Sequence, residues 1–138
     1  MTDDENKFKG PSVAVLIEEE FFFERTVKAL EALTVTPLLF DSIADQDCLD
    51  SLIAAQPIGI VVDLEDESFH GLSLVAAIRA TPELSQVPYI AYAAFDREDI
   101  HASAAALGVD VVLRSEYAAN LVKMFQSFLP KNNENGES

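Results

Sequence analysis

Several carboxylates are placed where the chain could hold a divalent cation. Glu18 and Glu19 follow the apolar stretch 13–17, and Asp63 ends the apolar stretch 58–63. Carboxylates that meet at one edge repel one another unless a proton or a cation lies between them, and hard divalent ions prefer oxygen ligands. The pattern therefore predicts a Mg²⁺ site with Asp63 at its centre.

These acids can meet only if parallel strands carry them to one edge of a sheet. Stretch 58–63 is short, unalternating and rich in β-branched residues, which is typical of a strand buried on both faces. In open α/β sheets, ligands bind outside the carboxyl ends of the strands. Asp63 therefore lies where a site is expected.

Strand-like and helix-like stretches alternate along the chain. Strands are predicted over 13–17, 35–40, 58–63, 87–92 and 109–113. Helices are predicted from the acids after the first strand to residue 33, and over 43–55, 72–80, 96–107 and 115–129. Right-handed crossovers place such helices on both faces of a parallel sheet. The predicted fold class is a flavodoxin-like (βα)5 three-layer α/β/α sandwich with a five-stranded parallel sheet.

Local signals place the ends of these elements. Pro37 lacks an N–H group, so its strand is expected at an edge of the sheet. Asp41 or Ser42, Asp96 and Ser115 are expected to be N-caps of helices, and Gly108 is expected to end one. The segments 1–11 and 131–138 are polar and are expected to be disordered tails around one domain, 12–130.

Composition excludes several classes of function. The chain has 24 acidic and 9 basic residues and a formal net charge of -15, which repels nucleic acids and anionic membrane surfaces. Cys48 is the only cysteine, so no intramolecular disulfide or zinc cluster can form. No apolar stretch is long enough to span a membrane. A cytoplasmic protein that binds neither nucleic acid nor membrane is expected.

The order of these features resembles the receiver domain of two-component response regulators from about Val13 to Leu129. The marks of the resemblance are the acidic pair Glu18 and Glu19, the aspartate Asp63, Gly71 with the following 72–79, Val87 and Pro88, and the turn 107–110. In that family the central aspartate accepts a phosphoryl group from a phosphohistidine on a partner kinase.

The resemblance implies roles for particular residues. Asp63 would be the phosphoacceptor, and Mg²⁺ would lie between Glu19, Asp63 and the main-chain carbonyl of Glu65, with Glu18 supporting the waters of the metal. The protein would be a stand-alone signalling module, not an enzyme beyond self-phosphorylation. Its partner would be a histidine kinase or a downstream signalling protein, and a homodimer is a further expectation.

The chain also departs from the family pattern. Ala93 replaces a Ser or Thr, Val112 replaces the aromatic switch residue, and Ser115 replaces the lysine. An acyl phosphate would add about two negative charges with no ammonium nearby. Arg114 is expected to point to the opposite face, because neighbouring strand side chains alternate, and whether it replaces the lysine stays open. The alternative function is a pseudo-receiver that docks without phosphorylation.

Two further functions are weaker alternatives. A magnesium phosphatase would use Asp63 and Glu65, although such enzymes carry a second aspartate instead of the glutamate. A flavodoxin-like nucleotide carrier would need a Gly, Ser or Thr-rich phosphate loop after the first strand, where this chain has three glutamates.

Aromatic and histidine residues complete the predictions. At least one residue of Phe21-Phe22-Phe23 is expected near the surface, where it could contact a partner. Tyr92 would join a pairing surface if its ring reaches the face formed by the last two strands and helices. His70 is expected to be exposed in its loop, and His101 is expected to have no special role.

Overall fold

The structure, a computed structural model, describes residues 11–40, 45–66 and 70–129. The predicted tails, apart from Pro11, and the predicted caps at 41 or 42 lie outside the described residues. The carbonyl of Pro11 accepts a hydrogen bond of 2.9 Å from the N–H of Thr36, so this residue already lies against the sheet. No helix in the described part of the chain is both long and apolar enough to cross a membrane.

One parallel sheet forms the centre of the molecule. Its strands are β1 (Ser12–Leu16), β2 (Thr36–Leu39), β3 (Gly59–Asp63), β4 (Tyr89–Ala93) and β5 (Val112–Leu113). They lie in the order β2-β1-β3-β4-β5, and every neighbouring pair is parallel. The strand that carries Asp63 is therefore central, and the strand that carries Pro37 is at an edge, as predicted.

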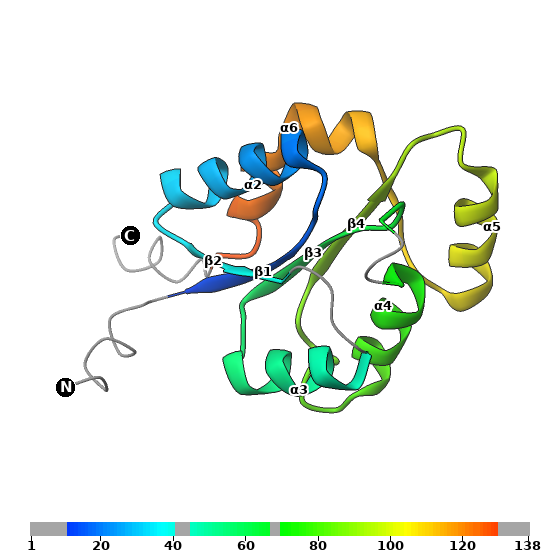
Figure 1. Cartoon of the computed structure of the whole chain (residues 1–138), viewed down its shortest axis with the longest axis horizontal. Helices are drawn as coiled ribbons and strands as arrows, with labels where there is room; N and C mark the ends of the chain where they lie inside the picture. Colours follow the sequence, from blue (N-terminus) through cyan, green and yellow to red (C-terminus); the bar gives the residue numbers. More distant parts are fainter. Residues whose placement is uncertain (1–10, 41–44, 67–69, 130–138) are drawn as a thin grey trace, which may run out of the picture.

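Helices cover both faces of this sheet. They are α2 (Glu20–Ala32), α3 (Asp45–Ala55), α4 (Gly71–Ala80), α5 (Glu98–Leu107) and α6 (Arg114–Gln126). Helices α2 and α6 lie on one face, and α3, α4 and α5 lie on the other (Figure 1). The predicted three-layer α/β/α fold is confirmed.

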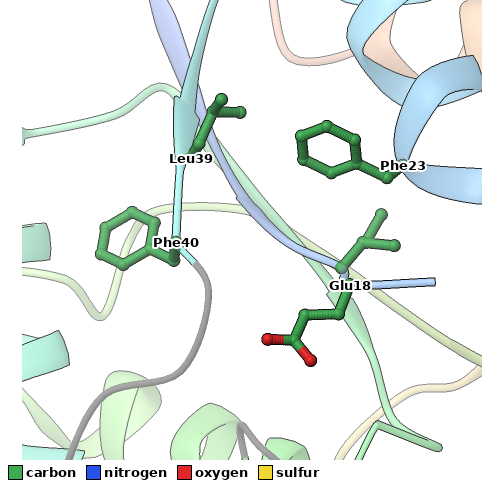
Figure 2. Close-up of a pocket in the computed structure, with 5 residues that line it drawn as sticks. Glu18, Phe23, Leu39 and Phe40 are labelled. Atoms are coloured by element: carbon green, nitrogen blue, oxygen red, sulfur yellow. The ribbon is translucent and has the colours of Figure 1, made fainter. Parts of the chain in front are cut away.

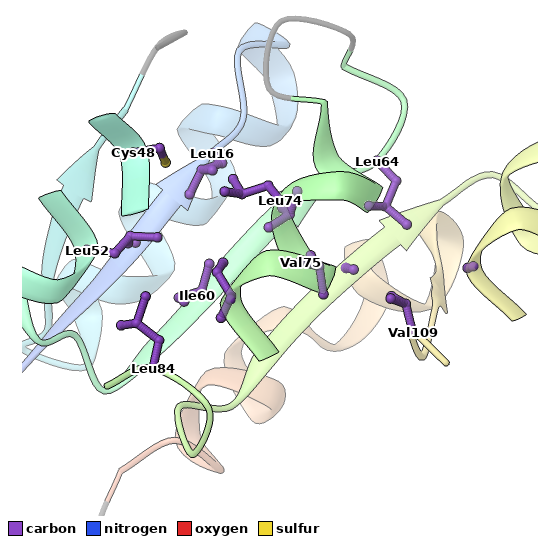
Figure 3. Close-up of a cluster of buried hydrophobic side chains, with 14 of the residues drawn as sticks. Leu16, Cys48, Leu52, Ile60, Leu64, Leu74, Val75, Leu84 and Val109 are labelled. Atoms are coloured by element: carbon purple, nitrogen blue, oxygen red, sulfur yellow. The ribbon is translucent and has the colours of Figure 1, made fainter. Parts of the chain in front are cut away.

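The core under α3, α4 and α5 is aliphatic (Figure 3). Leu16 and Ile60 from the strands meet Leu52, Leu74 and other side chains from the helices, all of them almost fully buried. Cys48 is buried in the same cluster, where its side chain packs as a small apolar group.

The core under α2 and α6 is rich in aromatic rings. Tyr92 from β4 packs there with Tyr117 and Phe125 from α6, and all three are almost fully buried. The suggestion that Tyr92 reaches a pairing surface is therefore wrong, because α2 and α6 cover its ring. Phe21 is 58% exposed, which confirms that the three consecutive phenylalanines do not all enter the core.

Two predicted helix caps are wrong. Helix α5 is preceded by Arg97, not by Asp96, and no side chain caps it; acidic Glu98 and Asp99 in its first turn favour the helix dipole instead. Helix α6 begins at Arg114, so Ser115 lies inside its first turn and Leu113 is the N-cap.

Other local predictions agree with the structure. Gly108 ends α5 with φ 73°, a left-handed conformation that glycine adopts without strain. His70 is exposed before α4, as expected for a loop histidine. The fifth strand is shorter than predicted, because only Val112 and Leu113 pair with β4.

Candidate functional site

Asp63 is the last residue of β3 and is 7% exposed. Its Oδ1 accepts a hydrogen bond of 2.9 Å from the N–H of Glu65. Residues after β1 lie at the same edge of the sheet, since Leu16 is paired with Val62 and the N–H of Glu18 donates to Asp66 Oδ2 at 3.2 Å. The acidic segments that follow β1 and β3 are thus side by side.

The surroundings of Asp63 favour its neutral form. Burial raises the pKa of its carboxyl group to about 6, and the negative charges of Glu65 and Asp66 raise this pKa as well. The hydrogen bond from Glu65 and the positive charge of Arg114 act in the opposite direction. A carboxyl group of this pKa exchanges its proton close to neutral pH.

Glu19 is the N-cap of α2. Its Oε1 accepts a hydrogen bond from Phe22 N at 3.0 Å, and its Oε2 accepts one from Phe21 N at 3.3 Å. Both carboxylate oxygens therefore satisfy N–H groups at the start of a helix, as N-cap acids do. The sequence predicted Glu19 as a metal ligand, but here its oxygens bind the protein itself.

The residues predicted to hold Mg²⁺ do not form a cluster of three metal-binding side chains in the described part of the chain. Among residues 11–40, 45–66 and 70–129, no three His, Cys, Asp or Glu side chains are grouped so that they could hold a metal ion. Glu18 is exposed, Glu19 caps α2, and the side chain of Glu65 binds elsewhere. A Mg²⁺ site that uses Asp63, Glu19 and the main-chain carbonyl of Glu65 stays a prediction.

The side chain of Glu65 connects the ends of β4 and β5 to the loop after β3. Its Oε2 accepts hydrogen bonds from the N–H of Ala94 at 2.8 Å and from Arg114 Nη1 at 3.2 Å. Its Oε1 lies 3.4 Å from Arg97 Nη1. The side chain is 19% exposed. Sequence reasoning considered only the main-chain carbonyl of this residue and missed the role of its carboxylate.

Two more residues of this network were not foreseen. His101 is partly buried, and its Nε2 lies 2.9 Å from the carbonyl oxygen of Ala94, so it is not without a role. Arg97 also pairs with Asp99 at 2.9 Å, and this hydrogen bond lowers the pKa of Asp99 to about 2. The signal in the sequence was that an arginine follows each of the last two strands, Arg97 after β4 and Arg114 after β5.

Arg114 lies on the site side of the sheet, contrary to the expectation. That expectation rested on the alternation of strand side chains, but β5 ends at Leu113 and Arg114 is the first residue of α6. A helical residue does not follow the pleat of a strand. The guanidinium group therefore reaches Glu65, and its charge lowers the pKa of Asp63.

The three positions that depart from the family pattern do not supply the hydroxyl, the aromatic ring or the ammonium group of that pattern. Ala93 is buried at the end of β4 in the aliphatic core. Val112 is paired with Tyr92 and is partly buried. Ser115 is exposed in the first turn of α6.

An aromatic pair lies beside Asp63. Tyr92 is paired with Asp63 in the register of β3 and β4, and its ring stacks on Tyr117 with centroids 4.4 Å apart. The hydroxyl of Tyr117 is hydrogen-bonded to that of Thr26, whereas the buried Tyr92 hydroxyl has no partner within the described residues. Burial and the charge of Asp63 raise the pKa of Tyr92 far above its usual value.

A pocket of about 370 Å³ opens at the other end of this edge. Figure 2 shows Phe23 from α2, Leu39 and Phe40 from the end of β2, and Glu18 after β1 around it. Asp63 does not line this pocket. It is a mainly apolar depression next to the acidic loops.

Comparison with solved structures identifies the class of fold. The signal receiver domain of a DNA-binding response regulator from Colwellia psychrerythraea 34H has a TM-score of 0.68 at 20% identity, covering 85% of this chain and 96% of that chain. A response regulator from Hahella chejuensis has a TM-score of 0.71 at 16% identity, covering 89% and 98%. The receiver-domain fold predicted from the sequence is therefore confirmed.

A third similar structure contains a metal. It is the receiver domain of a sensor histidine kinase from Pseudomonas aeruginosa PAO1, with a magnesium ion coordinated in the active site cleft. Its TM-score is 0.71 at 18% identity, covering 86% of this chain and 97% of that chain. No model of a protein family and no curated protein matches the sequence significantly.

Proposed function

We propose that this chain is a receiver-type module of two-component signalling that acts through protein–protein contacts, with Asp63 as the phosphoacceptor. The observation that carries the proposal is the place of Asp63 at the carboxyl end of the central strand of a receiver fold. Open α/β sheets bind their ligands at this edge.

The surroundings of Asp63 support phosphoryl transfer in part. Such a transfer needs an in-line nucleophile and groups that offset the developing negative charge. Above a pH of about 6 the Asp63 carboxyl group is mainly ionised, so it can act as a nucleophile. Arg114 and the N–H of Ala94 lie directly after β5 and β4 and could offset charge, although both bind Glu65 in this structure.

The finer parts of the proposal concern the partner and the metal. We propose a cytoplasmic module whose partner is a histidine kinase or a downstream signalling protein, or a second copy of the chain. Mg²⁺ is bound in the Pseudomonas receiver domain. In this chain, a metal bound by Glu19 would share its carboxylate oxygens with the N–H groups at the start of α2.

Treatment with a small phosphodonor tests the phosphoacceptor. Purified protein is incubated with acetyl phosphate, with and without Mg²⁺, and its intact mass is measured. One added phosphoryl group is expected on the wild-type chain and on Asp66→Asn, a matched control in the same loop, but not on Asp63→Asn. Labelling of Asp63→Asn would contradict the role of Asp63, and a chain that is never labelled would refute it.

A pseudo-receiver that docks without phosphorylation is the second candidate. It is favoured by Ala93 and Ser115, which replace the hydroxyl and the ammonium that the family pattern would supply. Exposed Phe21 and Phe95 offer apolar surface for such docking, with exposed fractions of 58% and 76%. Equal binding of a partner by the wild-type chain and Asp63→Asn would support this candidate.

A further inference from the structure

The carboxylate of Glu65 is held by cationic and N–H donors from two other segments of the chain. Ala94 follows β4, and its N–H donates to Glu65 Oε2 at 2.8 Å. Arg97 precedes α5, and its Nη1 lies 3.4 Å from Glu65 Oε1. Arg114 begins α6, and its Nη1 donates to Glu65 Oε2 at 3.2 Å. His101 binds the carbonyl of Ala94 and so steadies the same peptide segment.

This set of donors is the kind that binds an oxyanion. Guanidinium groups and backbone N–H groups form strong charge-assisted hydrogen bonds to carboxylate, sulfate and phosphoryl oxygens alike. A carboxylate from the chain itself therefore occupies positions that an external anion could take. Asp63 lies within two residues of Glu65, and the N–H of Glu65 binds its Oδ1, so the occupied donors are beside the proposed phosphoacceptor.

We propose that Glu65 acts as a built-in anion that occupies an oxyanion site formed by Ala94 N–H, Arg97 and Arg114. An external oxyanion, or a phosphoryl group on Asp63, binds these donors only after it displaces the Glu65 carboxylate. This inference rests on the proposed function because it describes the regulation of the same site.

The displacement has a measurable consequence. The apparent affinity of a site that is open for only a fraction of the time is reduced by that fraction. Removing the charge of Glu65 should therefore tighten the binding of an external oxyanion by about tenfold or more. Removing the neighbouring charge of Asp66, whose Oδ2 accepts a hydrogen bond from the N–H of Glu18, should have a much smaller effect, because it changes mainly the general repulsion.

Sulfate binding to full-length variants tests the inference. All variants carry Asp63→Asn, which removes the charge and the nucleophile of that residue, and sodium sulfate is titrated at constant ionic strength. The backbone amide resonance of Ala94 and the guanidinium N–H resonances of Arg97 and Arg114 report binding. The comparison is between Asp63→Asn alone, Asp63→Asn with Glu65→Gln, and the matched control Asp63→Asn with Asp66→Asn.

The expected result is binding about tenfold or more tighter with Glu65→Gln and less than about threefold tighter with Asp66→Asn. Equal affinity in all three variants would overturn the inference, as would an equal gain from Asp66→Asn. Should Glu65→Gln not fold, Glu65→Asp provides a second test, since its shorter side chain retains the charge but withdraws it from Ala94. If Asp63→Asn with Glu65→Asp then binds sulfate no more tightly than Asp63→Asn alone, the inference is contradicted.

The outcome is independent of phosphorylation. Asp63→Asn cannot form an acyl phosphate, so the sulfate titration reports only on the donors and on Glu65. If sulfate binds as expected while acetyl phosphate never labels the wild-type chain, the role of Asp63 fails and the built-in anion stands. If labelling succeeds but Glu65→Gln leaves sulfate binding unchanged, only the built-in anion fails.

Discussion

Asp63 combines two properties that act against each other. Its burial and the acids that follow it favour the protonated carboxyl group, whereas the proposed phosphoryl transfer needs the carboxylate. The resulting pKa of about 6 keeps most of the group ionised at neutral pH, at a cost in stability. The ionised carboxylate of Asp63 therefore destabilises the folded state at neutral pH.

The pH dependence of stability follows from this pKa. Because the folded-state pKa is raised from 3.8 to about 6, the folded state binds more protons than the unfolded state between these values, and stability falls as pH rises through them. Asp63→Asn should therefore stabilise the protein by about 3 kcal/mol above pH 7 and have little effect near pH 3.5. Urea unfolding of both proteins at each pH measures the difference.

The difference between the two proteins is the informative quantity, since the carboxylates that are not coupled to Asp63 titrate equally in both. Asparagine retains an oxygen that can accept the hydrogen bond from Glu65 N–H. A gain in stability that is the same at pH 3.5 and pH 7 would contradict the raised pKa of Asp63.

At the scale of elements, α2 and α6 are joined by polar bonds as well as by aromatic packing. The hydroxyls of Thr26 and Tyr117 form a buried hydrogen bond, and Arg25 Nη2 donates to the carbonyl of Ala118 at 2.9 Å. The ring centroids of Phe22 on α2 and Tyr92 on β4 are 5.6 Å apart. The two helices and the strand therefore pack as one unit beside Asp63.

Two matched tyrosine substitutions test this packing. Tyr117→Phe should destabilise the protein by about 1 to 3 kcal/mol, because it leaves the buried hydroxyl of Thr26 without a partner. Tyr92→Phe should be neutral or stabilise by about 1 kcal/mol, because the hydroxyl it removes is buried and has no partner within the described residues. Thermal and urea unfolding measure both, and equal losses in the two variants would contradict the assignment.

At the scale of the whole molecule, the net charge of -15 favours expansion of the chain. The same charge makes an acidic ligand or an anionic surface an unfavourable partner at low ionic strength. A protein partner with a basic surface would associate faster, and its association rate would fall as salt increases.

Screening of this charge should stabilise the fold. Raising NaCl from about 0.01 to 0.15 M shortens the Debye length from about 30 to 8 Å and should raise the free energy of unfolding on the order of 1 kcal/mol. Tetramethylammonium chloride at the same ionic strength should act equally, because screening does not depend on cation size. A gain restricted to NaCl would indicate a specific cation site instead.

The sequence by itself determined the architecture and the place of Asp63. Apolar strands without alternation, helical spacing between them, and Pro37 in the second strand were enough to predict a parallel sheet with that strand at its edge. These are local patterns, and each is decided by the burial and hydrogen bonding of a short segment. The resemblance to receiver domains followed from their order.

Only the tertiary structure decided which partners the acids have. Glu19 caps α2, and the Glu65 carboxylate bridges to Ala94 and Arg114, whereas the resemblance had implied that Glu19 and the main-chain carbonyl of Glu65 bind a metal. Helix α6 begins at Arg114, one residue earlier than predicted, and this turns Arg114 toward the site; a boundary shift of one residue reverses such an inference. A long side chain can reach several different partners, and the partner that it binds depends on which separate segments of the chain lie next to it.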